Sequence, residues 1–358
     1  MRIQQGFLPL GQPVVTAARL WHVPRARLMF VALPAAAVVL ITGCASQAPT
    51  SARAAASTPA PAPAGYACST AHIFTQPVDA AVDQQVTLGD TTAALTGTSA
   101  SDGVEPSELR GGVLTITRAG RAPVELPISA PAAASIVDLF ILDTQSGHAS
   151  PDDEAAGSLC LVRFSDGASP VVLIALTTGG AHCCITLRAV PADGGPAVDH
   201  DFGNYGPWLR TVSNGPTPVP VLVSADNAFA YQFTSFAGSG PPVQLFSWTG
   251  TAFADVTRDH LDVVRDDAQS YLAAYNDPTQ PEKLGFLTGY LADECVAGDA
   301  ADASNFVDQQ WQLGRVSDLD DPTATIATEA AVRQFVVVHG YCPASIGITA
   351  SRASSPTK

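Results

Sequence analysis

Between Gly111 and about Val256 the chain is a series of short apolar runs separated by turn residues. The runs include LCLVRF, VVLIALT, CCITLRAV, PVLVS and FAYQFTSF, and the turns at Ala119-Gly120 and Thr249-Gly250 lie between paired runs as in hairpins. Short runs at close, regular spacing are typical of an antiparallel sandwich, barrel or propeller rather than of alternating strands and helices. The pattern therefore predicts a β domain over residues 66–256.

After Asp255 the apolar spacing changes from two residues to three or four, which is the period of a helix. Thr257 stands where an N-cap is expected. One helical face is formed by Leu261, Val264, Ala268, Leu272 and Tyr275. The same spacing recurs in PEKLGFLTGYLADECVAG, SNFVDQQWQL and TIATEAAVRQFVVVHG. A mainly β fold is thus predicted to be followed by a helical region over 257–345 and a disordered tail over 346–358.

Two ten-residue phrases repeat within the β region. SDGASPVVLI, Ser165–Ile174, aligns with SNGPTPVPVL, Ser213–Leu222, at an offset of 48 residues, and four strand-like runs lie between the copies. A turn-led, four-stranded unit of this length has the size of a propeller blade. The repeat predicts a propeller-like domain, and the alternative is another antiparallel β domain in which this phrase occurs twice.

The N-terminal segment has the pattern of an export signal. The first 43 residues contain four arginines and no acidic residue, and they end in a 14-residue apolar run that is shorter than the roughly 20 residues of a membrane span. The run leads into ITGC, Ile41–Cys44, which resembles the lipobox of bacterial lipoproteins. That resemblance implies cleavage before Cys44 and attachment of diacylglyceryl and palmitate. The alternatives are an ordinary signal peptide or a membrane anchor with a chance cysteine.

A leader that begins at Met1 is unusually long. We therefore predict that translation starts at Val23, which leaves a leader of ordinary length before Cys44. Behind Cys44, residues 45–65 consist almost wholly of Ala, Pro, Ser and Thr. Such a segment cannot bury enough apolar surface to become ordered. Residues 44–65 are therefore predicted to be a lipid anchor and a disordered tether.

The charge balance excludes one class of partner. Of the 18 basic residues four lie in the leader, which leaves 14 against 33 acidic residues and a net charge of −19. An acidic body of this kind repels nucleic acid and anionic lipid. The acidic excess serves either solubility, the interpretation we favour, or the attraction of cations.

Three phrases between Leu159 and Arg258, under a third of the chain, resemble a known group. They are TGGAHCC, SADNAFAYQFTSFAGSGPPVQLF and FADVTR, and with them the region resembles exported bacterial proteins related to the FG-GAP or VCBS-type propeller repeats. The resemblance implies a propeller fold and turns of the type D-x-D-G-D that hold calcium.

The turns that correspond to these calcium loops are poor in carboxylates. They read SDGAS and SNGPT, with at most one carboxylate each, whereas calcium takes six to eight oxygen ligands. A second stretch, Asp318–Glu329, matches an EF-hand loop only at its first, third and last positions and lacks the glycine at the sixth, so we interpret it as the start of a helix. No metal is expected in either place.

Six cysteines follow Cys44, and an even number in an exported protein favours disulfides. Adjacent strand residues point to opposite faces, so Cys183 and Cys184 need separate partners. The apolar faces of their strands predict that Cys160 meets Cys183. The predicted pairs are Cys160 with Cys183, Cys184 with Cys68, and Cys295 with Cys342.

The run GGAHCC could also be read as chemistry. His182 with Cys183 and Cys184 would have to converge on one ion to bind a metal, and a cysteine nucleophile would have to stay a reduced thiolate. Adjacent strand residues point apart, which disfavours the metal site. An oxidising location disfavours the free thiolate. Gly179 and Gly180 are interpreted as a turn.

A loop-like stretch, DHDFGNYGPW, is the best candidate for a ligand contact. Its candidate residues are Asp199, His200, Asp201, Asn204, Tyr205 and Trp208. The alternative is a blade turn with a packed Trp208. A second aromatic set, Phe229, Tyr231, Phe233 and Phe236, forms either a sugar-stacking platform or part of the core, and its alternation favours the core.

No G-x-S-x-G elbow, H-E-x-x-H pair or P-loop occurs, so no cofactor is expected and the catalytic residues stay unknown. The predicted function is a lipid-anchored module at the outer face of the membrane that binds or scaffolds a wall or envelope protein or glycan. The alternatives are an envelope hydrolase that uses carboxylates such as Asp199 and Asp201, and a purely structural wall component.

Overall fold

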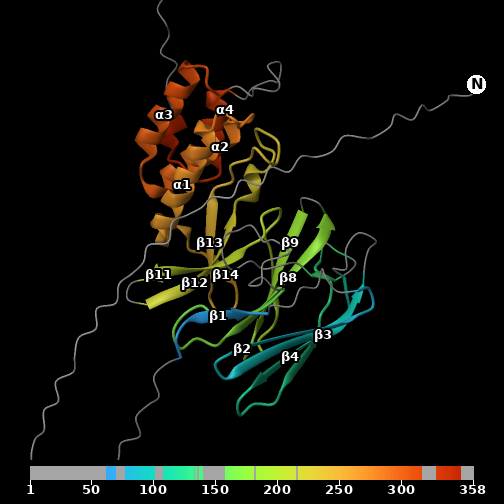
Figure 1. Ribbon diagram of the computed structural model, residues 1–358. Coiled ribbons are helices and arrows are strands. Elements are labelled where there is room, and N and C mark those ends of the chain that lie inside the picture. Colours follow the sequence, from blue (N-terminus) through green and yellow to red (C-terminus); the bar gives the residue numbers. More distant parts are fainter. Residues whose placement is uncertain are drawn as a thin grey trace, which may run out of the picture. The chain divides into compact units, whose positions relative to one another are not determined.

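The computed structural model describes residues 62–69, 77–100, 108–132, 134, 137–139, 158–180, 183–214, 217–316 and 328–347. All of them belong to one compact unit, Pro59–Lys358. Antiparallel strands come first and four helices follow, as predicted (Figure 1). The leader, Cys44, residues 45–61 and residues 348–358 lie outside the described residues. The predicted tether and tail both extend too far, because Gly65 begins β1 (Gly65–Cys68) and the buried Ile346 lies in η4 (Ala344–Gly347).

Most strands belong to three consecutive antiparallel meanders. The first contains β2 (Ala81–Leu88), β3 (Thr91–Ala100), β4 (Glu108–Arg118) and β5 (Val124–Pro127). The second contains β7 (Leu159–Arg163), β8 (Val171–Gly180), β9 (Cys183–Pro191) and β10 (Val198–Asp201). The third contains β11 (Trp208–Asn214), β12 (Thr217–Ala225), β13 (Val243–Trp248) and β14 (Phe253–Asp255). Both hairpins predicted from turn residues, β4–β5 and β13–β14, are confirmed.

Two short strands complete the sheets. β1 (Gly65–Cys68) pairs with β7, and β6 (Asp138–Leu139) lies between β4 and β8, so the first two meanders form one ten-stranded sheet. The third meander is a separate four-stranded sheet. The described strands close no ring, so a propeller is not shown.

The second meander is buried on both faces because a layer packs against each. One face joins the first meander through residues that include Leu161, Ile174 and Leu95. The other face packs on the third meander through Leu173, Leu187 and Leu222, among others. Every residue of β7 is buried as a result. This explains why LCLVRF reads as a continuous apolar run rather than an alternating one.

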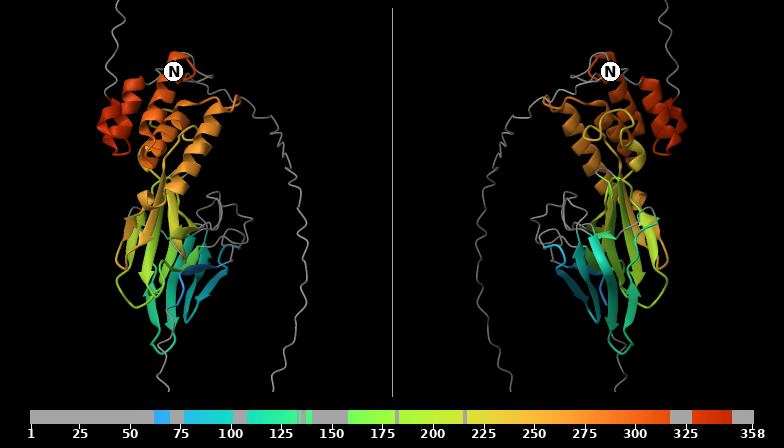
Figure 2. Two further views of the ribbon diagram at one scale, coloured as in Figure 1. Left: turned by 90° about the vertical axis from the view of Figure 1, so that its left-hand side faces the viewer. Right: turned by 90° about the vertical axis from the view of Figure 1, so that its right-hand side faces the viewer.

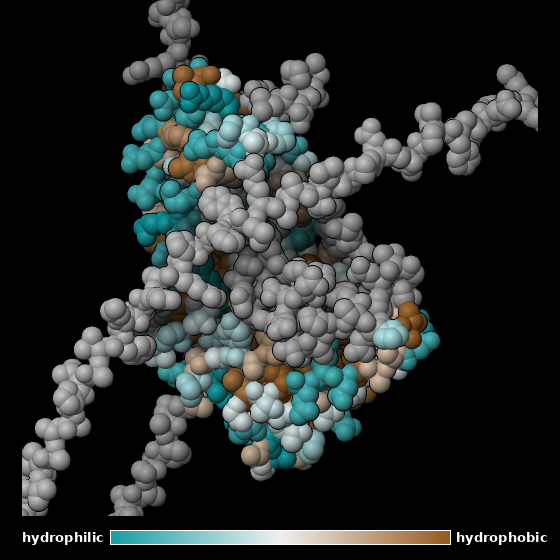
Figure 3. Space-filling model, in the orientation of Figure 1, coloured by the Kyte–Doolittle hydropathy of each residue, from teal (hydrophilic) through white to brown (hydrophobic). Residues whose placement is uncertain are grey.

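The helices form one group beside the third sheet (Figure 2). They are α1 (Leu261–Asn276), α2 (Leu284–Ala297), α3 (Ala300–Gln312) and α4 (Glu329–Val338), and the short 3-10 turns are η2 (Asn227–Phe229), η3 (Thr257–Asp259) and η4 (Ala344–Gly347). Val263 and Val296 pack on Val221 and Leu245 of the third sheet. In Figure 3 the outer face of the helical group is largely hydrophilic.

α2 is the central helix of this group. Nearly all of its residues are buried, so α2 has almost no face exposed to solvent. It ends at Gly298, whose φ of 101° is left-handed, as the stop signal predicts. The prediction that Thr257 caps α1 is wrong. Thr257 starts η3 instead, where its hydroxyl donates to Asp255 and accepts from the Leu245 N–H.

The predicted strand FAYQFTSF is also wrong. Its first residue, Phe229, ends η2, Tyr231 is left-handed with a φ of 59°, and no residue between β12 and β13 is in a strand. The loop instead lies against α2 through glycines. A Cβ added to Gly285 would be 2.1 Å from the Gly238 carbonyl oxygen, and one added to Gly289 would be 2.4 Å from that of Gly240. This close backbone contact replaces the sheet that alternation suggested.

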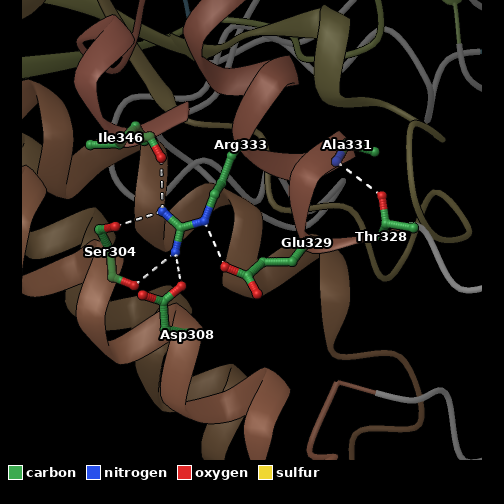
Figure 4. Close-up of polar contacts among 7 residues, drawn as sticks. All are labelled: Ser304, Asp308, Thr328, Glu329, Ala331, Arg333 and Ile346. Atoms are coloured by element: carbon green, nitrogen blue, oxygen red, sulfur yellow. Dashed lines mark hydrogen bonds and ion pairs between the residues drawn. The ribbon is translucent and has the colours of Figure 1, made fainter. Parts of the chain in front are cut away.

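A buried arginine joins the last two helices (Figure 4). Arg333 of α4 is 2% exposed, and it donates to Glu329, to the Ser304 hydroxyl and carbonyl, to the Ile346 carbonyl and to Asp308. Two carboxylates and neutral acceptors thus satisfy the guanidinium. Thr328 caps α4 by accepting from the Ala331 N–H, so this end of the EF-hand-like stretch is a helix N-terminus.

One disulfide prediction is confirmed and two are wrong. Cys295 and Cys342 are joined, which links the end of α2 to the segment after α4. Cys68 is bonded to Cys160 rather than to Cys184, because β1 pairs with β7 in a register that sets the two cysteines opposite each other. Cys160 is therefore not available to Cys183. Cys184 is disulfide-bonded as well.

Candidate functional site

Two adjoining hollows lie beside the third sheet and share Asp226 and Gln244 in their walls. The larger, of about 310 Å³, lies between η3 and the segment that follows α4. The smaller, of about 210 Å³, lies between the end of β10 and η2. Their walls are supplied by segments far apart in the sequence. We call the two hollows together the acidic crevice.

Asp226 stands at the centre of the acidic crevice because it follows β12 and caps η2. Its Oδ1 accepts from the Ala228 N–H at 2.9 Å, and its Oδ2 accepts from the Tyr341 hydroxyl at 2.8 Å. The Gln244 amide also points to that hydroxyl, at 3.5 Å. Burial, followed by the nearby Asp226 carboxylate, raises the pKa of Tyr341, so this phenol stays a proton donor at all ordinary pH values.

The outer wall of the larger hollow carries charge. Asp255, Arg258 and Asp259 are exposed there, and the Arg258 guanidinium donates to the Gly340 carbonyl at 3.3 Å. With Asp226 the wall holds three carboxylates against one guanidinium. Such a concave surface concentrates cations and hydrogen-bond donors rather than anions.

The structure divides the predicted ligand loop between several roles. Asp199 forms a two-point ion pair with Arg188, at 2.6 and 2.7 Å, and is therefore occupied. Asp201 lines the smaller hollow and accepts from the Gly203 N–H. His200 lines the same hollow. Asp199 and Asp201 do not act together as a carboxylate pair, because both oxygens of Asp199 are bound by Arg188.

His200 packs among aromatic rings. Its ring centroid lies 4.5 Å from that of Phe202, 5.3 Å from that of Phe246 and 5.6 Å from that of Phe253. Burial lowers its pKa, with Asp201 opposing the effect. A histidine in these surroundings is held in its neutral form, which can donate or accept a hydrogen bond at the rim of the hollow.

The remaining three loop candidates lie outside the crevice walls. The Asn204 N–H donates to Asn227, which ties the loop to η2. Trp208 packs with the core between the third sheet and the helices. Tyr205 stacks on Phe236, with centroids 5.4 Å apart, and Tyr231 contacts the same ring.

The second aromatic set therefore separates into two groups. Phe229 is 4% exposed and packs with Phe233 against Phe335 of α4, which confirms the core interpretation for these two rings. Tyr231 is 53% exposed and Phe236 is half-buried. The alternation that suggested one strand face does not hold, because the backbone there is irregular.

The run GGAHCC does not contribute to the crevice. The Cys184 N–H donates to the Thr178 hydroxyl at 2.7 Å, and its sulfur is in a disulfide. The position of His182 and the side chain of Cys183 lie outside the described residues. Within the described ranges, no group of three or more His, Cys, Asp or Glu side chains is arranged to hold a metal ion. No helix in the described part of the chain is long and apolar enough to cross a membrane.

The central residues of the crevice are ones that sequence reasoning missed. Asp226 and Gln244 belong to the phrase SADNAFAYQFTSFAGSGPPVQLF, and Arg258 belongs to FADVTR, so two of the three phrases that carry the resemblance line the crevice. An Asp-Asn pair directly after a buried strand is the signal of a cap and could have drawn attention to Asp226. Tyr341 lies 115 residues away and offers no local signal.

Comparison with known proteins gives one distant relative. No family model matches the chain, and no solved structure matches it. A probable thylakoid lumen protein of Synechocystis sp. is 28% identical over 205 residues, which cover 50% of this chain and 58% of that protein. The chain thus spans less than two thirds of the relative's length. The printed name of the relative assigns that protein to the thylakoid lumen and indicates no specific function.

Proposed function

We propose that the protein is a lipid-anchored module of the cell envelope that binds its ligand in the acidic crevice. The observation that carries this proposal is the convergence of Asp226, Gln244 and Tyr341 between two adjoining hollows. One phrase supplies a carboxylate and an amide, and a segment 115 residues after Asp226 supplies a phenol. A few convergent polar groups in a concave surface are typical of binding sites. The three stacked meanders support a propeller-like origin for this scaffold.

The charge of the crevice indicates the ligand class. Carboxylates outnumber the single guanidinium, so a ligand that presents hydroxyl groups or a protonated amine is favoured over an anionic one. Wall glycans and basic segments of envelope proteins both offer such groups without a negative charge, whereas the phosphates of nucleic acid would be repelled. Because Asp226 already accepts two hydrogen bonds, it is held rigidly, which suits recognition.

A binding experiment tests the role of the crevice. Soluble wall fragments would be titrated into the full-length protein in detergent micelles and followed by calorimetry. A D226N/Y341F double variant removes the charge and the phenol, and we expect it to weaken binding at least tenfold, the effect of losing a charge-assisted hydrogen bond. D83N, on the exposed face of β2, is the matched control and should bind like the wild type. Equal binding by all three proteins would refute a role for the crevice.

The lipid anchor at Cys44 would hold this module at the outer face of the membrane, with the Ala, Pro, Ser and Thr segment before β1 as its tether. Its support is the ITGC sequence after a short apolar run. Mass spectrometry of the mature N-terminal peptide should find an acylated Cys44, and C44S should release the protein from the membrane fraction. An unmodified Cys44 in membrane-bound protein would rule the anchor out.

Hydrolysis is the second candidate function, because Asp201 and Asp226 both line the smaller hollow, with His200 beside them. Asp199, named in the sequence-based hypothesis, is occupied by Arg188. Incubation of the wall fragments with the protein, followed by chromatography of the products, distinguishes the two functions. Product formation that D201N abolishes would favour the hydrolase, and intact fragments that remain bound would favour the binding module.

A further inference from the structure

Two carboxyl groups face each other between α1 and α2, directly behind the wall of the acidic crevice. Asp293 of α2 is 1% exposed, and Asp267 of α1 is partly buried. The Asp267 Oδ2 accepts from the Val243 N–H, at the first residue of β13, at 3.2 Å. Val243 lines the larger hollow, and so does Val296, one turn beyond Asp293. The pair thus connects both helices to the strand that forms the crevice wall.

Asp293, unlike Asp267, has no hydrogen-bond donor among the described residues. The two carboxyl groups are nevertheless close enough to alter each other's titration. Two ionised carboxylates can only accept hydrogen bonds and repel each other. A proton on one of them supplies the missing donor and removes one charge. Buried carboxyl pairs share a proton for this reason.

The surroundings offer no positive charge to replace that proton. Glu294 on α2 acts on Asp293, and the charges of the pair act in turn on Tyr271 on α1 and on Tyr341 after α4. All three are acidic or neutral. The positive charge of Arg265 acts on Glu294 and its guanidinium donates to the Ala297 carbonyl.

We propose that Asp267 and Asp293 form a proton-held latch, in which a shared proton keeps α1 and α2 closed on the start of β13 and its loss at higher pH loosens this wall of the acidic crevice. Opening releases one proton to solvent and leaves two carboxylates that must separate or take up water. The closing and opening of the latch need no ligand. Only its role in regulating ligand access rests on the proposed function.

The direction of the pH dependence follows from the fold. Burial raises the pKa of Asp267 to about 6, and burial together with the Asp267 charge raises the pKa of Asp293 well above its usual value. In the unfolded chain both titrate near 3.8. The folded state therefore holds more protons above pH 4, so the latch is fully closed in acid and is lost as the pH rises through the folded pKa values.

Hydrogen exchange of the full-length protein, without ligand, tests the latch. Peptides covering β13 would be followed by mass spectrometry between pH 5 and pH 8.5, with rates corrected for intrinsic exchange. In the wild type we expect the protection of β13 to fall with rising pH, approaching tenfold per pH unit, the slope that one released proton produces. D293N supplies an amide donor to Asp267 without a titrating group, so it should keep β13 protected at every pH.

D267N gives the same test from the other carboxyl group and serves if D293N fails to fold. D262N, an exposed Asp→Asn change on the same helix α1, is the matched control and should retain the wild-type slope. Equal protection of the wild type at pH 5 and pH 8.5 would overturn the proposal, as would an unchanged slope in D293N and D267N. Because no ligand is present, this outcome is independent of whether the crevice binds wall fragments.

Discussion

At the residue scale, His200 shows how tertiary packing sets the chemistry of a side chain. In the sequence it stands between two aspartates, which suggests a charged site. In the structure it alternates to the other face of β10 and packs against three phenylalanine rings. Burial outweighs the Asp201 charge and lowers the pKa. The folded state therefore favours the neutral imidazole.

We predict that H200F and H200Q both reduce the loss of stability in acid. The unfolded chain binds a proton at His200 near pH 6.5, whereas the folded chain binds it only at lower pH, so stability decreases as the pH falls below 6.5. Urea denaturation at pH 8, 6.5 and 5 should show a smaller decline for both variants than for the wild type. H200Q serves as the control for polarity, since it keeps a polar group but does not titrate. Parallel declines in all three proteins would contradict the prediction.

At the element scale, α2 and the loop before β13 depend on each other. The helix is buried nearly all round, and Gly285 and Gly289 allow the backbone of Gly238 and Gly240 to approach it. Alternating aromatic residues in the loop predicted a strand. The glycines of the loop and of α2 instead allow the two backbones to lie in close contact. A strand needs a neighbouring strand to accept its hydrogen bonds, and this loop has a helix beside it.

We predict that G289A destabilises the protein by about 1–3 kcal/mol, although Ala is otherwise the better helix former. The added methyl would lie 2.4 Å from the Gly240 carbonyl oxygen, and a backbone atom cannot rotate away. Urea denaturation measures the change. G195A is the matched control, because its methyl meets only side-chain atoms, at 3.2 Å or more, and it should unfold close to the wild type. Equal stability of G289A and wild type would disprove the close contact.

Element types could largely be predicted from the sequence, because they follow from local periodicity. The continuous apolar runs of β7 and β8, the hairpin turns, the helical spacing of α1 and the Gly298 stop all act over a few residues. The errors arose where a neighbour overrides the pattern. Thr257 looks like a cap until the Leu245 N–H is seen to occupy its hydroxyl, and GYAC gives little sign of being β1 until β7 is beside it.

At the scale of the whole molecule, two disulfides join segments that are distant in sequence. Cys68–Cys160 spans 92 residues and fixes β1 to β7, and Cys295–Cys342 spans 47 residues and joins the end of α2 to the segment after α4. Each disulfide stabilises the fold mainly by reducing the conformational entropy of the unfolded chain. The longer loop should therefore give the larger gain in stability.

We predict that the C68S/C160S variant loses about 3–5 kcal/mol of unfolding free energy and that C295S/C342S loses slightly less, as the shorter loop requires. Thermal denaturation of the two double variants gives the comparison. Peptide mapping of the wild type without reduction should recover the Cys68–Cys160 and Cys295–Cys342 peptides. A peptide that joins Cys160 to Cys183 would show that the register of β1 on β7 is wrong.

The sequence by itself determined that strands precede helices and that the chain is acidic, and it gave the export signal as an expectation. These depend on composition or on spacing within one element. Only the tertiary structure decided that Asp226 meets Tyr341, that Asp267 faces Asp293 and that Cys68 lies opposite Cys160. Such contacts depend on how layers stack and in which register, and side chains brought together across layers leave no period in the sequence.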